Sequence, residues 1–150
     1  MAPISGTVKL VTECEDEVFA SEALGKGVVI EPEEGKVYAP CDGEISAFFE
    51  TKHAIGITAV NGMELLIHVG MNTVTLNGEG FIPHAEAGDK IRKGQLLLEF
   101  DMDFIRSKGL PVSTPVVIAN LDDGKGVSCR LGAVKKGEAL ITVCNEQEEK

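Results

Sequence analysis

The sequence is poor in aromatic residues and in basic ones. It has no Trp and one Tyr, and aromatic residues make up 5% of the chain, so its core would consist mainly of aliphatic side chains. Lys and Arg number 14 against 24 Asp and Glu, which gives a formal net charge of −10 at pH 7. Such a chain repels nucleic acids and anionic membrane surfaces, so we expect neither as a partner. A protein with a basic patch would be attracted instead, although acidity also serves solubility alone.

Long hydrophobic runs and paired cysteines are absent as well. No apolar run approaches the roughly 20 residues of a membrane-spanning helix, and no signal sequence is recognisable. The four cysteines, Cys14, Cys41, Cys129 and Cys144, form no C-x-x-C pair. These features favour free thiols in a reducing cytosol. A start at MAPISG is equally compatible with a domain of a longer, membrane-anchored chain.

Turn-forming glycine is abundant. The 17 glycines recur in dipeptides such as Asp42-Gly43, and between them lie short runs rich in Val, Ile, Leu and Thr. This spacing predicts many short strands in a sandwich or barrel, with helix only briefly around Asp103–Ser107. A chain of 150 residues with 43% hydrophobic content fits one globular domain over residues 1–150. We expect residues 145–150 to form a frayed tail.

One turn signal predicts the register of a hairpin. The dipeptide Asn61-Gly62 between two strand-like runs favours a two-residue type I′ turn, because both central residues of that turn need positive φ. Such a turn pairs Val60 with Met63 and places His68 opposite Ile55. Side chains alternate between the two faces of a strand, so every second residue then shares the face of His68.

This register predicts that two of the three histidines meet. His53 becomes a diagonal neighbour of His68, with Cα atoms roughly 7–8 Å apart, and Thr51 lies on the same face as the candidate to orient the ring of His53. An imidazole nitrogen is a competent nucleophile toward phosphoryl groups, and a second imidazole can hydrogen-bond to the oxygens of the transferred group. A metal could use the same pair, although zinc needs further ligands. The third histidine, His84, is expected at the surface.

Longer stretches of the chain resemble a known family. The resemblance is to the glucose-type enzyme IIA of the bacterial sugar phosphotransferase system, and it is carried by FETKHAIGI (Phe49–Ile57), LLIHVGMNTVTLNGEGF (Leu65–Phe81), DEVFASEALGKGVVIEP (Asp16–Pro32), VYAPCDGEI (Val37–Ile45), LLEFD (Leu97–Asp101) and TPVVIAN (Thr114–Asn120). These stretches cover nearly the whole chain. The resemblance implies an all-β fold, an antiparallel β-sandwich of many short strands with minimal helix.

The resemblance also implies a function, that of a phosphoryl carrier in sugar uptake. His68 would accept a phosphoryl group on Nε2 from the histidine phosphocarrier protein and pass it to a cysteine of a IIB domain of a sugar permease. His53 would hydrogen-bond to that group, and Thr51 would orient His53. The positions that match the family's apolar docking face are Val18, Phe19, Leu24, Phe49 and Leu66. A cytoplasmic phosphotransferase that requires no cofactor is expected, either free or within a permease chain.

One position departs from the family's pattern. Where the motif usually runs His-x-Gly-x-Asp-Thr-Val, this sequence has Asn72 before Thr73 and Val74. Asp16 matches a second acidic residue near the phosphorylation site. A carboxylate repels a phosphoryl group, so Asn72 would either stabilise phospho-His68 or alter the docking of a basic partner.

Other functions are compatible with the same residues. A zinc-dependent hydrolase would use His53, His68 and a carboxylate such as Asp16, but no H-x-H or H-E-x-x-H spacing supplies further ligands and a base. A swinging-arm carrier needs a modified lysine at a hairpin tip, and neither Lys26 nor Lys52 has the required neighbours. A regulatory binding module without transfer stays open, as does a regulatory zinc ion at His53 and His68.

Overall fold

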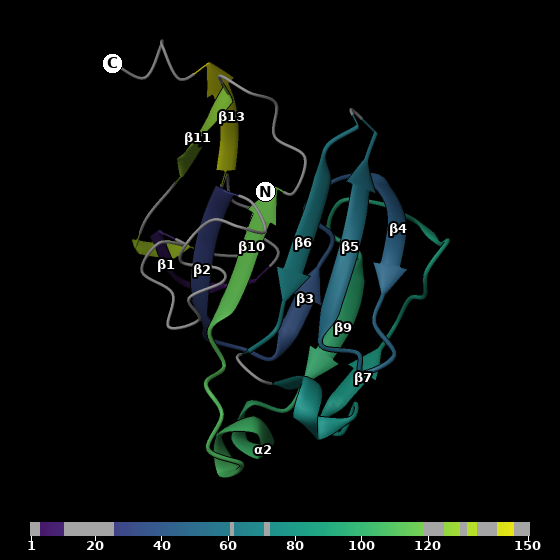
Figure 1. Ribbon diagram of the computed structural model, residues 1–150, viewed down its shortest axis with the longest axis vertical. Helices are drawn as coiled ribbons and strands as arrows, with labels where there is room; N and C mark the ends of the chain where they lie inside the picture. The colour runs from purple at the N-terminus through teal and green to yellow at the C-terminus, as the bar shows by residue number, and fades with distance from the viewer. Residues whose placement is uncertain are drawn as a thin grey trace.

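Short antiparallel strands build the molecule. The computed structural model describes residues 4–10, 26–60, 62–70, 73–118, 125–129, 132–134 and 141–145. Its largest sheet has the order β12 (Gly132–Val134), β1 (Gly6–Leu10), β2 (Lys26–Pro32), β10 (Thr114–Ile118), β6 (Glu64–His68), β5 (Ala54–Ala59), β4 (Gly43–Phe48) and β8 (Lys90–Ile91). A second sheet has the order β3 (Lys36–Tyr38), β9 (Leu96–Phe100) and β7 (Phe81–Pro83). β11 (Lys125–Cys129) pairs with β13 (Ile141–Asn145) in a ribbon at the top of Figure 1.

Aliphatic side chains from the two larger sheets share one core. In Figure 1, β3 and β9 lie behind β5 and β6, and their buried residues belong to a single hydrophobic cluster. The largest fully buried side chains are Ile4, Ile30, Ile45, Ile55, Ile57, Ile67, Leu97, Leu98, Ile105, Ile118 and Val28. Full burial of one such side chain contributes about 1.5–3 kcal/mol. The predicted antiparallel β-sandwich with an aliphatic core is therefore confirmed.

Helix is scarce in the described ranges, as the sequence predicts. The helix α2 (Met102–Ser107) begins after the N-cap Asp101, whose side chain accepts a hydrogen bond from Phe104 N at 3.0 Å. The loss of such a cap typically costs about 1 kcal/mol. Ile105 anchors the helix in the core. A 3₁₀ turn, η2 (Thr73–Leu76), follows β6.

The hairpin of β5 and β6 has a different register from the predicted one. Ala54 lies opposite His68, and Ile55 lies opposite Ile67. The predicted pairing of His68 with Ile55 is therefore wrong by one residue. Residues opposite each other share a face of the sheet, and side chains alternate along a strand. The shift therefore places Ala54 on the face of His68 and Ile55 on the opposite face.

The turn of this hairpin explains the difference. Ala59 N donates to Met63 O at 2.8 Å, and Gly62 N donates to Ala59 O at 2.9 Å. The loop thus contains three residues, and the predicted two-residue turn with Val60 paired to Met63 is wrong. Gly62 has a φ of 90°, which suits the left-handed end position of a three-residue hairpin loop. The glycine therefore fits both loop lengths and does not by itself decide between them.

The predicted tail begins within a strand. Asn145 belongs to β13, and the other residues of the predicted tail, 146–150, lie outside the described ranges.

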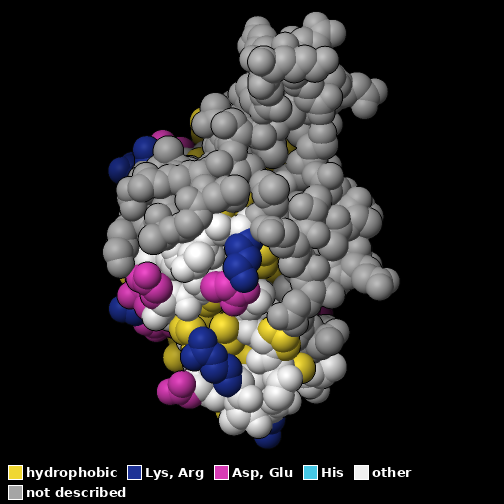
Figure 2. Space-filling view, turned by 90° about the vertical axis from the view of Figure 1, so that its left-hand side faces the viewer, with side chains coloured by type: hydrophobic (Ala, Val, Ile, Leu, Met, Phe, Trp, Pro, Cys, Tyr) yellow, Lys and Arg dark blue, Asp and Glu magenta, His cyan; other side chains and the backbone are white. Residues whose placement is uncertain are grey.

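On the side drawn in Figure 2, acidic and basic side chains alternate with small hydrophobic areas, and no histidine is visible on the part that the structure describes.

Candidate phosphoryl-transfer site

Two histidine rings meet at one end of the β5–β6 hairpin. His68 is the last residue of β6, and His53 immediately precedes β5. Their ring centroids are 4.8 Å apart, and the ring planes are inclined by 81°. The predicted convergence of His53 and His68 is confirmed.

The route by which His53 reaches His68 differs from the predicted one. Ala54 lies opposite His68, so strict alternation would assign His53 to the face of Ile55, which belongs to the core. His53 does not follow that alternation, because it lies in the connection between β4 and β5 rather than in a strand. Phe49 N closes this connection by donating to Ala54 O at 3.1 Å. The conformation of the connection therefore determines the direction of the His53 ring.

The proton of His68 is fixed by a backbone carbonyl. Its Nδ1 lies 2.8 Å from Gly70 O. A carbonyl oxygen only accepts hydrogen bonds, so Nδ1 donates and carries the proton. In the neutral ring, the lone pair then belongs to Nε2. The geometry thus makes Nε2 the nucleophilic nitrogen of His68.

A tight turn holds this carbonyl in place. Gly70 has a φ of 76°, and a Cβ at this position would lie 2.5 Å from Thr73 Cγ2 and 2.9 Å from Pro111 O. The buried Thr73 in turn donates from Oγ1 to Val69 O at 2.5 Å. Gly70 is a functional residue that the residue-by-residue reasoning missed, and its signal was the glycine two positions after His68 in the family motif.

His53 is buried and held by Thr51. Its side chain is 3% exposed, and its Nδ1 lies 2.6 Å from Thr51 Oγ1. The pKa of His53 is lowered to about 4, chiefly by burial and next by the charge of His68, while a hydrogen bond with the backbone of Thr51 opposes the shift. His53 is therefore neutral at pH 7. The structure places Thr51 where the sequence predicts it.

The apolar residues predicted to dock partners are placed in part. Phe49 is 47% exposed, and its ring centroid lies 5.5 Å from that of His53. Leu66 is half-buried and precedes His68 by two residues on β6. The remaining predicted site residues, Val18, Phe19, Leu24, Asp16 and Asn72, lie outside the described residues.

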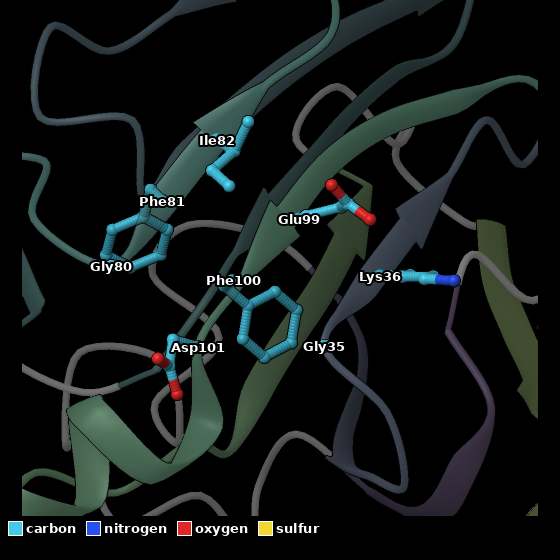
Figure 3. A pocket seen from close by; sticks show the side chains of 8 residues that line it. All are labelled: Gly35, Lys36, Gly80, Phe81, Ile82, Glu99, Phe100 and Asp101. Carbon is cyan, nitrogen blue, oxygen red and sulfur yellow. The ribbon is translucent and has the colours of Figure 1, made fainter.

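A surface groove lies in a different part of the fold. Its volume is about 510 Å³, and it is lined by Gly35, Lys36, Gly80, Phe81, Ile82, Glu99, Phe100 and Asp101 (Figure 3). Glu99 lies opposite Lys36 on one neighbouring strand and opposite Ile82 on the other. His84 Nε2 lies 3.0 Å from Glu99 Oε2. Neither His53 nor His68 lines the groove, so it is separate from the histidine site. The sequence did not indicate it, because it forms only where β3 pairs with the much later strand β9.

Two further features bear on the alternatives. Among the described residues, no group of three or more His, Cys, Asp or Glu side chains could hold a metal ion. Asp16, the carboxylate of the zinc-hydrolase hypothesis, is not among those residues. In the ranges that the structure describes, no helix is long and apolar enough to span a membrane.

The fold and the site together define a β-sandwich protein with two imidazoles in contact, one of them with an oriented nucleophilic nitrogen. The family model described as "phosphoenolpyruvate-dependent sugar phosphotransferase system, EIIA 1" matches residues 1–124. The chain belongs to this family of EIIA components, which are phosphoryl carriers in sugar uptake.

Individual relatives agree with this assignment. The chain is 47% identical over 142 residues to the "PTS system glucose-specific EIIA component" of Bacillus cereus, which covers 94% of this chain and 86% of that protein. It is also 47% identical over 126 residues to the "PTS system beta-glucoside-specific EIIBCA component" of Dickeya chrysanthemi, with 84% of this chain but only 20% of that longer protein covered.

A solved structure supports the fold directly. The glucose permease IIA from Mycoplasma capricolum superposes with a TM-score of 0.88 at 34% identity, over 93% of this chain and 91% of that one. The two chains therefore share the β-sandwich.

Proposed function

We propose that this chain accepts a phosphoryl group from the histidine phosphocarrier protein on Nε2 of His68 and donates it to a cysteine of a IIB domain of a sugar permease. The observation that carries the proposal is the contact between the rings of His53 and His68, at a centroid distance of 4.8 Å. Neutral imidazoles in contact gain little stability by themselves, and a shared phosphoryl group gives both of them a role.

The acceptance step uses the lone pair on Nε2 of His68. This nitrogen attacks phosphorus in line, a new N–P bond forms, and the N–P bond of the donor phosphohistidine breaks as the donor ring recovers its lone pair. The Nδ1 proton stays on His68, 2.8 Å from Gly70 O. The carbonyl dipole stabilises the positive charge that the ring gains when Nε2 is phosphorylated.

His53 stabilises the transferred group. Because its pKa is about 4, it is neutral at pH 7 and has one N–H to donate. When the Thr51 hydroxyl donates to Nδ1 of His53 across their 2.6 Å separation, the remaining proton is on Nε2. That N–H can then donate to the equatorial oxygens of the phosphoryl group, where charge accumulates.

Partner docking uses an apolar surface around the histidines. Phe49 and Leu66 belong to it, and Val18, Phe19 and Leu24 are proposed members. Exposed apolar residues of this kind are typical of interaction sites, and the net charge of −10 attracts partners with basic patches.

Asn72 adjusts the charge at this surface. An amide in place of a carboxylate removes one repulsion of the phosphoryl group, which would either stabilise phospho-His68 or alter the docking of a basic partner. Asp16 is the second acidic position proposed near the site. The transfer itself requires no metal. Zinc needs three or four protein ligands, so the two imidazoles would hold a regulatory zinc ion only when a partner adds further ligands.

The sugar is selected elsewhere. Relatives carry names that refer to glucose and to β-glucosides, although their EIIA portions are all similar to this chain. We place the sugar specificity in the permease and the transfer in the cytoplasm, by a free chain or by a domain of a membrane-anchored permease.

The test is intact-mass spectrometry after incubation with phosphoenolpyruvate, enzyme I and the histidine phosphocarrier protein. We expect one added phosphoryl group that is labile in acid, stable in base and located on His68. His68→Ala should abolish the addition, whereas His84→Ala, which changes an exposed histidine directly after β7, should leave it intact. Phosphorylation that survives in His68→Ala would show that the acceptor is another residue.

A further inference from the structure

Lys52 has a backbone conformation that lysine seldom adopts. Its φ is 64°, and among the described residues only Asn77 shares a positive φ without being glycine. Asparagine tolerates this left-handed region because its short polar side chain can bond locally, whereas for lysine the conformation is disfavoured. An outlier of this kind persists only where its surroundings hold it, and such outliers cluster at functional sites.

A backbone hydrogen bond supports this conformation of Lys52, and its side chain lies near Gly78. Its backbone N donates to Phe49 O at 2.8 Å within the connection from β4 to β5. Its side-chain stem lies against Gly78, since a Cβ built on that glycine would be 3.5 Å from Lys52 Cδ and 3.7 Å from Cε. The stem thus joins the β4–β5 connection to the turn that follows η2.

The left-handed conformation of Lys52 affects its neighbour His53. It lies directly between Thr51 and His53, the two residues joined by the 2.6 Å hydrogen bond. Alternation along the strand would assign His53 to the core face of Ile55, yet its ring contacts His68 on the other face. A left-handed residue reverses the local path of the chain and so redirects the side chain that follows it.

We propose that Lys52 is a positioning residue whose left-handed backbone conformation, rather than its side chain, turns His53 toward His68. The orientation of His53 follows from the structure of the unphosphorylated chain alone. Its consequence for phosphoryl transfer rests on the proposed function.

The first test compares two substitutions at this position by NMR. Lys52→Asn removes the charge and the stem but keeps a residue that tolerates positive φ, whereas the β-branched side chain of Lys52→Val opposes it. We expect nuclear Overhauser contacts between the His53 and His68 rings in the wild type and in Lys52→Asn, and their loss in Lys52→Val. The pKa of His53 should stay near 4 in the first two proteins and rise by about one unit or more toward 6.5 in the third.

A matched control separates orientation from general damage. Lys90→Val introduces the same side chain at an exposed lysine of β8, and it should leave the ring contacts and the pKa of His53 unchanged. If Lys52→Val does not fold, Lys52→Thr replaces it, since threonine is also β-branched and opposes positive φ, and the same direction of change is expected.

The second test measures transfer. Discharge of phospho-His68 to a IIB domain should be about tenfold slower or more in Lys52→Val than in Lys52→Asn. The proposal is overturned if Lys52→Val keeps the ring contacts, or if Lys52→Asn loses them equally, because the charge or the stem would then orient His53. If the NMR results are as expected and the wild type is not phosphorylated, the proposed function fails and the positioning role stands.

Discussion

A single hydrogen bond decides which nitrogen of His68 carries the proton. The carbonyl of Gly70 holds the proton of His68 on Nδ1, and Thr51 engages Nδ1 of His53. The two rings therefore differ in role although they are in contact. One presents a lone pair, and the other is kept neutral by its burial.

Replacement of His53 by glutamine separates acceptance from transfer. In His53→Gln the amide can still donate a hydrogen bond, so His68 should still be phosphorylated. The amide lacks the imidazole geometry that Thr51 fixes, and we expect discharge to a IIB domain to slow by about tenfold or more. Rapid-quench measurement of both half-reactions checks this expectation. Discharge at the wild-type rate would remove His53 from the mechanism.

The lowered pKa of His53 makes stability depend on pH. The unfolded chain titrates this histidine near 6.5, and the folded chain titrates it near 4. Between these values the unfolded state binds more protons, so stability is fully present above about pH 6.5 and falls as the pH falls toward 4, by about 3 kcal/mol in total.

Urea unfolding from pH 4.5 to 7 measures this contribution. Carboxylates also titrate in acid, so the difference between the wild type and His53→Gln isolates the histidine. The wild type should lose more stability than the variant as the pH falls. Parallel curves for the two proteins would show that His53 is not protected from protonation.

Turns, at the scale of elements, position the two histidines. His68 is oriented by the turn after β6, and His53 is oriented by the connection before β5. The pairing of β5 with β6 brings the backbones of the two histidines close together, and the turns determine where their rings point.

The turn after β6 leaves no room for a side chain at Gly70. Gly70→Ala should destabilise the fold by about 1–3 kcal/mol, because a Cβ meets Thr73 Cγ2 at 2.5 Å and Pro111 O at 2.9 Å. Gly94→Ala is the matched control, since Gly94 also has a positive φ of 88° but nothing lies within 4 Å of its Cβ position. Thermal unfolding should show a smaller loss for the control, and equal losses would mean that the turn adapts.

The sequence predicted the class of fold and the meeting of the histidines, but not the way in which they meet. Glycine spacing and short apolar runs sufficed for a β-sandwich, and the helix around Asp103–Ser107 is confirmed. The hairpin register was wrong by one residue, because Gly62 fits a three-residue loop as well as a two-residue one. The left-handed Lys52 was not predictable, since no residue preference favours lysine there.

Contacts between distant parts of the chain could not be predicted from the sequence either. β10 inserts between β2 and β6, and no local signal indicates that neighbour. The groove of Figure 3 arises in the same way, because β3 lies far in sequence from β7 and β9, which complete it. Such features depend on the packing of the whole core rather than on local propensity.

At the scale of the whole molecule, the proposed docking of partners would use an apolar surface on an acidic protein. Phe49 is 47% exposed next to His53, and its truncation removes apolar contact without opening the core. We expect Phe49→Ala to raise the KM for the histidine phosphocarrier protein by about tenfold, with only a small change in Tm.

A second exposed residue provides the comparison. Ile82 is 57% exposed on β7, in the groove that lies apart from the histidines. Ile82→Ala should change neither the KM nor the Tm appreciably in steady-state and thermal measurements. An equal rise in KM for both variants would argue against a docking surface centred on the histidine site.

The most direct test of the carrier function is a discharge experiment. The chain is phosphorylated, freed from the upstream proteins and mixed with a IIB domain of a sugar permease, and the intact masses of both are followed in time. We expect one phosphoryl group to leave His68 as one appears on a cysteine of the IIB domain. A phosphoryl group that remains on the chain, or that is released only as inorganic phosphate, would contradict the proposal that this protein passes it on.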